Sequence, residues 1–262
     1  MPHPLDMSAK VVIVTGGCRG IGRAIATRFL EAGAEVVICC RNQPDELPEA
    51  GDREAVFVAA DVREPEQVDA VVNAAVERFG RLDVLVNNAG GSPPAEAATA
   101  SPRFSAAIIN LNLIAPLQMA QRANTVMQGQ EEGGVIVNIG SVSGLRPSPG
   151  TAAYGAAKAG LVNLTQTLAV EWAPKVRVNC VTAGVVRTEQ AHLHYGDEAA
   201  IAAVDATVPL GRMGEPADVA DACLFLASPL ARWVSGSNLV VHGGGERPAF
   251  LDAAAPGGSG DG

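Results

Sequence analysis

Short apolar runs alternate with amphipathic stretches along almost the whole chain. Seven of the runs are rich in β-branched residues and nearly free of polar ones, which is typical of strands covered on both faces. The predicted strands are 10–15, 35–40, 55–60, 82–87, 134–139, 176–181 and 238–242. Helical spacing lies between them at 20–32, 65–79, 103–128, 152–173 and 216–227. This alternation predicts an α/β fold with a doubly wound parallel sheet of seven strands and helices on both faces.

The pattern shows no linker, repeat or composition break between residues 8 and 245, which we interpret as one domain. Residues 189–208 are inserted between the sixth strand and the next helix, and we expect them to form a lid. Residues 1–7 are expected to be a disordered arm and 246–262 a C-terminal tail. The start of the chain lacks the basic and apolar regions of a secretory signal, so we expect a cytoplasmic protein.

Composition narrows the range of partners. Of the 262 residues, 48% are hydrophobic, which is typical of a folded globular protein. The formal charge of -9 argues against nucleic acid or an anionic membrane as the main partner. We therefore expect a small-molecule ligand.

The cysteines indicate buried thiols rather than cross-links. The chain has five, and Cys39, Cys40, Cys180 and Cys223 fall in apolar runs, where free cysteine behaves as a small hydrophobe. No CxxC occurs, and the four histidines do not have zinc-site spacing. We therefore expect neither a disulfide nor a metal.

A glycine-rich stretch, "TGGCRGIG" (15–22), follows the first predicted strand and opens the first helix. Glycines at 16, 20 and 22 allow a tight turn, a close approach of backbone to phosphate, and close packing of helix on strand. In this strand–turn–helix setting, the stretch predicts a dinucleotide site.

The spacing T-G-x-x-x-G-x-G resembles the short-chain dehydrogenase/reductase family. Further family segments follow in order: "DV" (61–62), "NNAG" (87–90), "NLN" (110–112), Ser141 with "YGAAK" (154–158), and "RVNCVTAG" (177–184). The resemblance covers roughly residues 10–245 and implies a Rossmann-type catalytic domain that binds a nicotinamide cofactor. The cofactor contacts that it implies are Gly16, Cys18, Arg19, Gly20, Ile21, Gly22, Arg41, Asp61, Val62, Asn88, Ala89, Gly90, Tyr154, Lys158, Val186 and Thr188.

The end of the second strand bears on the choice between NAD(H) and NADP(H). An acidic residue there would bind a free 2′-hydroxyl and repel a 2′-phosphate, but this chain has Cys40 followed by Arg41. Arg19 in the glycine loop adds a second guanidinium suited to a phosphate. We therefore predict NADP(H). The alternative is that Arg41 only begins a solvated loop and is neutralised by Asp45 or Glu46.

Tyr154 and Lys158 carry the expected chemistry. Residues four apart on a helix share one face, so Lys158 would stand near the cofactor ribose while Tyr154 points to a bound carbonyl. A free phenol, with a pKa near 10, is a poor acid or base at neutral pH. We expect the ammonium and the oxidised nicotinamide to lower the Tyr154 pKa toward working pH.

Two further side chains complete the catalytic set. Ser141, at the end of the fifth strand, would donate to the substrate oxygen as negative charge builds on it. Asn112 resembles the family's helix-interior asparagine, which links the lysine to solvent through a water. Asn110 competes for that role, but the family's N-L step selects Asn112.

The chain departs from the family pattern at two places. Ala183-Gly184 replaces the usual Pro-Gly, which frees one φ angle but removes no catalytic group. His242 stands where relatives often have an aspartate, and we expect a structural or subunit-contact role for it.

The resemblance implies hydride transfer between NADP(H) and a ketone or secondary alcohol, in the reductive direction, as in 3-oxoacyl-carrier-protein reductase-like enzymes. The alternatives are an NAD-dependent secondary-alcohol, steroid or sugar dehydrogenase and a non-catalytic cofactor-binding regulator. A regulator would lack Ser, Tyr or Lys, and all three are present. We also expect a homotetramer through helices 103–128 and 152–173.

Overall fold

The computed structural model describes residues 3–246, 248 and 250, without the side chains of residues 193 and 194. Most of the predicted C-terminal tail (247, 249 and 251–262) lies outside the described residues, as do residues 1 and 2 of the predicted arm. Among the described residues, no helix combines the length and the apolar character required to cross a membrane.

The main sheet has seven parallel strands in the order β5-β2-β1-β6-β7-β8-β9, which confirms the predicted fold. Its strands are β1 (Val11–Thr15), β2 (Glu35–Cys40), β5 (Val56–Ala59), β6 (Val84–Asn87), β7 (Gly134–Ser141), β8 (Val176–Ala183) and β9 (Asn238–Val241). The strand order reverses between β1 and β6. In open sheets of this kind, ligands bind at such a reversal, beyond the carboxyl ends of the strands.

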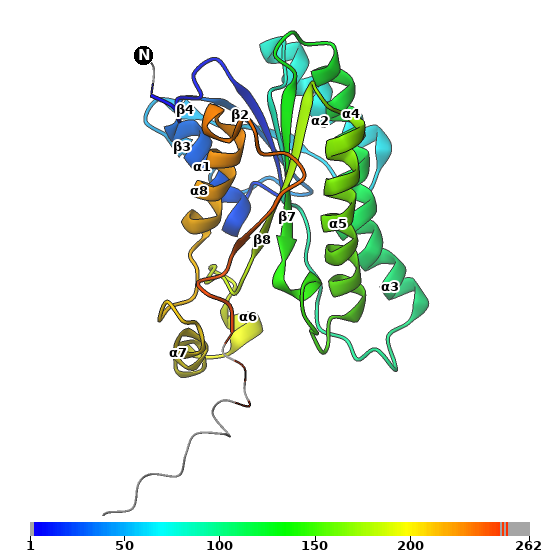
Figure 1. Ribbon diagram of the computed structural model, residues 1–262, viewed down its shortest axis with the longest axis vertical. Coiled ribbons are helices and arrows are strands. Elements are labelled where there is room, and N and C mark those ends of the chain that lie inside the picture. The colour runs from blue at the N-terminus through cyan, green and yellow to red at the C-terminus, as the bar shows by residue number, and fades with distance from the viewer. Residues whose placement is uncertain (1–2, 247, 249, 251–262) are drawn as a thin grey trace, which may run out of the picture.

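Helices cover both faces of the sheet (Figure 1). One face carries α1 (Gly20–Glu31) and α8 (Pro216–Ala227), and the other carries α2 (Pro65–Phe79), α4 (Ala115–Gln128) and α5 (Ala152–Glu171). The remaining helices are α3 (Pro102–Ile109), α6 (His192–Tyr195) and α7 (Glu198–Thr207), with short helical turns at η2 (Val142–Gly144) and η3 (Pro229–Ala231). A small antiparallel hairpin, β3 (Glu49–Ala50) with β4 (Arg53–Glu54), was not predicted.

The two faces explain why the predicted strands are mostly apolar. Along β1, Val12 and Val14 join the core under α1 and α8, whereas Val11 and Ile13 join the core under α2 and α4. Successive strand side chains point to opposite faces, so a strand buried on both sides accepts a polar residue only where that residue finds hydrogen-bond partners.

The predicted helix 103–128 is not continuous. It consists of α3, a π-helical turn η1 (Asn110–Ile114) and α4. Asn112 lies inside this turn, and its side-chain amide donates to the carbonyl of Ile108 at 2.9 Å. Single π turns within helices occur frequently at functional sites.

Two expectations from the sequence differ from the structure. Cys18 and Cys40 form a disulfide, so the expectation of no disulfide is wrong, and only Cys39, Cys180 and Cys223 are free buried thiols. At the N-terminus, residues 3–7 pack onto the fold instead of forming a free arm. Met7 is buried and its N–H donates to the carbonyl of Ala32.

A chain of buried amides ties the sheet to the helices that carry the candidate site. The Asn87 side chain donates to Asn138 Oδ1 at 2.9 Å and to the carbonyl of Pro116 at 3.0 Å. Asn138 donates in turn to Thr165 Oγ1 on α5 at 2.9 Å, and Thr165 donates to the carbonyl of Leu161. These contacts join β6, β7, α4 and α5.

We expect Asn138→Ala to lower the free energy of unfolding by about 2–3 kcal/mol, because it removes one hydrogen bond from each of two buried polar partners, Asn87 and Thr165. Urea denaturation measures this change. The control is Asn163→Ala on the exposed side of α5, which should stay within about 0.5 kcal/mol of the wild type. Equal stabilities of the two variants would contradict the role of the amide chain.

Candidate functional site

The predicted site residues gather at the carboxyl edge of the sheet because all seven strands are parallel. Thr15 pairs with Cys39, Asn87 with Asn138, and Ser141 with Ala183 in the strand register. The ends of β1, β2, β6, β7 and β8 therefore open toward one side. In Figure 1, α6 and α7 lie beyond the lower end of the long central strands.

The glycine loop is folded tightly against the end of β6. Gly16 and Gly20 have φ values of +66° and +53°, in the left-handed region that glycine favours. A Cβ on Gly22 would lie 2.2 Å from the Gly16 carbonyl oxygen, so any side chain there would collide with backbone. Asn88 fixes the loop by donating to the carbonyls of Thr15 at 2.9 Å and Gly16 at 3.2 Å.

A carboxylate already lies at the N-terminus of α1. Glu189 Oε1 accepts the backbone N–H of Gly20 at 2.9 Å. The unpaired N–H groups at a helix start attract anions, including the pyrophosphate of a dinucleotide. Thr188 flanks the same point, since a Cβ on Gly20 would lie 3.4 Å from its methyl carbon. Val186 forms an isolated β-bridge with Gly214, which fixes the loop segment leading to Thr188.

The two arginines predicted to bind a 2′-phosphate are exposed, and neither has an ion-pair partner within the described part of the chain. Glu46 instead faces Arg23 at 3.6 Å, so the predicted neutralisation of Arg41 by that residue is not seen. Arg41 lies near enough to Asp61 to contribute, as a minor cause, to the lowered pKa of that carboxyl. The main cause is the hydrogen bond from Arg63, whose Nε donates at 2.9 Å.

Lys158 is fully enclosed and stands at the centre of the predicted catalytic set. Its side chain is about one turn along α5 from Tyr154, and the ammonium lies 5.6 Å from the centre of the Tyr154 ring. The residue is 3% exposed, and Nζ donates to the Ile139 carbonyl of β7 at 2.8 Å. A Cβ on Gly90 would lie 3.3 Å from Nζ and 2.6 Å from Asn112 Oδ1, so Gly90, Asn112 and Lys158 meet at one place.

Asn112, in the π turn, contacts the loop after β6 next to Lys158. Its Oδ1 accepts the N–H of Gly91 at 2.9 Å, and its Nδ2 donates to the carbonyl of Gly91 at 3.0 Å. The residue is 0% exposed. The structure therefore brings Asn112 rather than Asn110 into the loop after β6.

The pKa directions differ from the sequence expectation. Burial raises the pKa of the Tyr154 phenol, and a hydrogen bond with the Ser141 hydroxyl opposes this shift only in part. Burial also lowers the pKa of Lys158 to about 8. The Tyr154 pKa is thus raised in the protein without cofactor, because removal of water from the phenol outweighs the hydrogen bond with Ser141.

Three polar residues near the site were missed by sequence reasoning. Arg146, just after η2, forms an ion pair with Glu246, which follows β9. Tyr195 of α6 lies close enough to both residues for their charges to affect its pKa. Burial raises the Tyr195 pKa, the Arg146 guanidinium lowers it, and the Glu246 carboxylate raises it further. No motif marks these residues, because they come from three separate segments that only the fold brings together.

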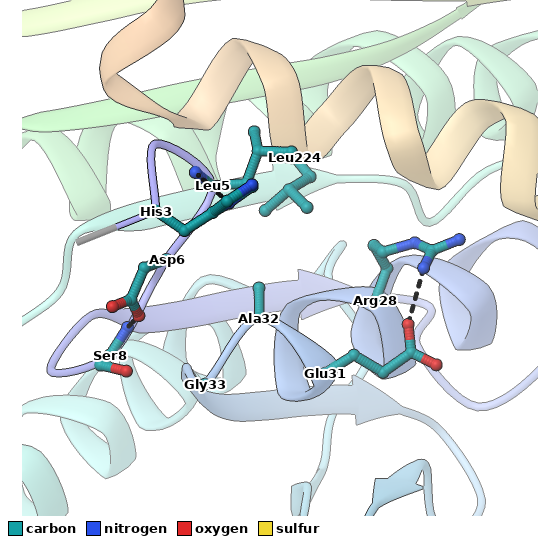
Figure 2. A pocket seen from close by; sticks show the side chains of 9 residues that line it. All are labelled: His3, Leu5, Asp6, Ser8, Arg28, Glu31, Ala32, Gly33 and Leu224. Atoms are coloured by element: carbon teal, nitrogen blue, oxygen red, sulfur yellow. Dashed lines mark hydrogen bonds and ion pairs between the residues drawn. The ribbon is translucent and has the colours of Figure 1, made fainter. Parts of the chain in front are cut away.

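A hollow elsewhere on the molecule holds none of the predicted site residues. It lies between the N-terminal segment and the end of α1 (Figure 2), with His3, Leu5 and Asp6 on one side and Arg28 with Glu31 on the other. Arg28 and Glu31 pair at 2.8 Å. Its charged groups are therefore already engaged with one another.

A strand–glycine loop–helix unit beside a Ser–Tyr–Lys–Asn set defines a nicotinamide-dependent oxidoreductase. A family model described as "Enoyl-(Acyl carrier protein) reductase" matches residues 16–246. The chain belongs to the short-chain dehydrogenase/reductase family, whose members are oxidoreductases that act on CH–OH groups and the corresponding carbonyls.

Individual relatives act on different alcohols. The 3beta-hydroxysteroid dehydrogenase 1 of Eggerthella lenta is 38% identical over 251 residues, covering 91% of this chain and 94% of the relative. The L-fucose dehydrogenase of Oryctolagus cuniculus is 38% identical over 247 residues, covering 91% and 86%. The ligand-free aldohexose dehydrogenase of Thermoplasma acidophilum superposes with a TM-score of 0.84 at 32% identity, covering 98% and 99%.

The buried ammonium predicts a pH-dependent stability. Between pH 8 and 10.5 the unfolded chain keeps the Lys158 proton while the folded protein releases it, so the free energy of unfolding rises with pH in this window. Relative to Lys158→Met, the cofactor-free wild type should gain about 2 kcal/mol between about pH 7.5 and about pH 9.5. Urea denaturation at the two pH values measures the gain, and a constant difference would contradict the burial of a charged lysine.

Proposed function

We propose that the protein transfers a hydride between NADP(H) and a ketone or secondary alcohol, working as a reductase. The observation that carries the proposal is the meeting of Ser141, Tyr154, Lys158 and Asn112 beside the glycine loop at the strand reversal. The geometry gives each residue a separate task.

Tyr154 hands a proton to the carbonyl oxygen during reduction and takes it back during oxidation. Ser141, already in hydrogen-bond contact with the phenol, donates to the same oxygen and stabilises the charge that builds there. Lys158 donates to the ribose hydroxyls and favours phenolate, and Asn112 holds the loop against which the ammonium rests. The bound nicotinamide supplies the hydride.

The dinucleotide residues fit an extended cofactor. Gly16, Gly20, Ile21 and Gly22 line the pyrophosphate turn, and Val186 with Thr188 face the nicotinamide amide. Asp61, Val62, Asn88 and Ala89 are proposed to border the adenosine half, whereas Gly90 lies beside Lys158, toward the nicotinamide end. An incoming pyrophosphate takes the place that the Glu189 carboxylate holds at the Gly20 N–H.

Tyr154→Phe tests the proton transfer, since it removes one hydroxyl from an otherwise unchanged ring. We expect kcat for carbonyl reduction to fall at least about a hundred-fold, with NADPH affinity changed only slightly. Absorbance of NADPH measured with a panel of ketones, steroids and sugar alcohols gives both the rate and the substrate class.

The matched control is Tyr195→Phe, which removes the hydroxyl of the chain's other tyrosine. Its kcat should stay within about ten-fold of the wild type, because the Tyr195 hydroxyl has no proposed role in proton transfer. Full activity of Tyr154→Phe would contradict the proposed mechanism.

The preference for NADP(H) is supported by two exposed arginines, Arg19 in the glycine loop and Arg41 just after β2. The last residue of β2 is Cys40, so no carboxylate stands there to repel a 2′-phosphate. Arg41→Ala should weaken NADPH binding about ten-fold or more, by loss of a charge-assisted contact, and leave NADH binding unchanged. Fluorescence titration measures both nucleotides.

Arg103→Ala is the control for net charge. This residue is exposed on α3, away from β2, and should leave both affinities unchanged. Equal binding of NADPH and NADH by the wild type would favour the NAD-dependent alternative.

The substrate is proposed to be a neutral ketone of small or medium size. Residues 189–208, which we propose to act as a lid, contain Glu189, Asp197, Glu198 and Asp205 but no lysine or arginine. Such a surface repels an acidic carrier protein, which weakens the 3-oxoacyl-carrier-protein reductase reading. The named relatives act on steroids and sugars, which favours an NAD-dependent steroid or sugar dehydrogenase as the second candidate.

The protein is also proposed to form a homotetramer through the helical segments 103–128, which spans α3 and α4, and 152–173, which contains α5. Exposed Ile109 and Ile114 at the π turn and Val170 near the end of α5 support this, because they add apolar surface outside the core. Isologous pairing of two such faces would bury it.

A further inference from the structure

The disulfide joins two segments that belong to the proposed cofactor site. Cys18 lies in the glycine loop just before α1, and Cys40 is the last residue of β2. They are 22 residues apart in sequence, with Cα atoms 6.5 Å apart, which lies within the range a disulfide spans. Each is followed directly by one of the arginines proposed to bind the 2′-phosphate, Arg19 and Arg41.

The bond differs from the other cysteines in its surroundings. Cys39, Cys180 and Cys223 are buried in the core, whereas Cys18 and Cys40 are only partly buried. A surface hollow lined by Cys18, Arg19, Gly20 and Arg23 opens beside Cys18, so a small reagent can approach the bond from that side. Redox-active cysteine pairs share this combination of mutual contact and access.

We propose that Cys18 and Cys40 form a reversible redox site that controls binding of the dinucleotide, in which the dithiol form binds it tightly and the disulfide form weakly. This rests on the proposed function, because it places the adenosine ribose between the glycine loop and the end of β2. Oxidation turns both sulfur atoms toward each other, so neither can contact the ribose, and it ties the glycine loop to β2. The loop can then no longer adjust to the incoming nucleotide.

The reaction is thiol–disulfide exchange with a low-molecular-weight disulfide. One protein thiolate attacks a sulfur of the reagent, forms a mixed disulfide and releases one thiol. The second protein thiolate then displaces the remaining half of the reagent as a second thiol. The protein loses two electrons and two protons, and the reagent gains both.

The test uses the full-length protein after incubation with glutathione disulfide or with dithiothreitol. Alkylation in denaturant followed by mass spectrometry should find three free thiols in the oxidised sample and all five in the reduced one. Peptide mapping should recover the peptides of Cys18 and Cys40 linked to each other.

Fluorescence titration with NADPH should then give a dissociation constant about ten-fold higher after oxidation, restored by dithiothreitol; loss of one or two polar contacts has this size. Cys40→Ser should make the constant independent of redox treatment, whatever its absolute value. Cys223→Ala, which removes a core thiol, should keep the redox dependence.

Three results would overturn the proposal: five free thiols after oxidation, a glutathione adduct without the Cys18–Cys40 link, or a formed link with unchanged NADPH affinity. Failure of the proposed function gives a different result, which is no nucleotide binding in either redox state.

Discussion

The burial of one ammonium group, that of Lys158, constrains the structure around it. A charge removed from water requires acceptors, and the Ile139 carbonyl at the end of β7 supplies one. The remaining space is kept small by Gly90, where a side chain would collide with both the ammonium and Asn112. The position of α5 against β7, the bare loop after β6 and the turn that holds Asn112 all follow from this requirement.

The same constraint explains why the protein alone is not primed for acid–base chemistry. Burial shifts the phenol and the ammonium in opposite directions, each toward its neutral form. Ribose hydroxyls that accept hydrogen bonds from the ammonium would oppose the shift of Lys158, and a positive nicotinamide would oppose the shift of Tyr154. In the proposed mechanism, Tyr154 therefore transfers a proton only in the complex with cofactor, when a hydride donor or acceptor is also present.

Much of this was predictable from the sequence. Strands buried on both faces have an unmistakable apolar pattern, so the sheet and the layer helices were predicted with bounds close to those observed. The glycine loop and the order of the family segments indicated candidate site residues, and the structure brings Ser141, Tyr154, Lys158 and Asn112 together. The pattern could not show the π turn, because Asn110–Ile114 has ordinary helical composition and its extra residue appears only in backbone hydrogen bonds.

Other features were missed because they depend on contacts distant in the chain. Cys18 and Cys40 have no CxxC spacing, and only the folding of the glycine loop onto β2 brings them together. The pairing of Arg146 with Glu246 joins residues 100 apart. The raised pKa of Tyr154 in the protein without cofactor was not predicted, since sequence shows the neighbouring charge but not the loss of water.

The π turn between α3 and α4 has a geometric consequence for how this region tolerates length changes. A π turn holds one residue more than the α turn it replaces, and one residue corresponds to about 100° of rotation about a helix axis. The apolar stripe of α4, which contains Met119, Ala123 and Met127, is therefore out of phase with that of α3. Deleting a single residue here would restore a regular helix and turn either the α4 stripe away from the sheet or Ile108 of α3 away from its buried position, so shortening disturbs packing on both sides of the turn.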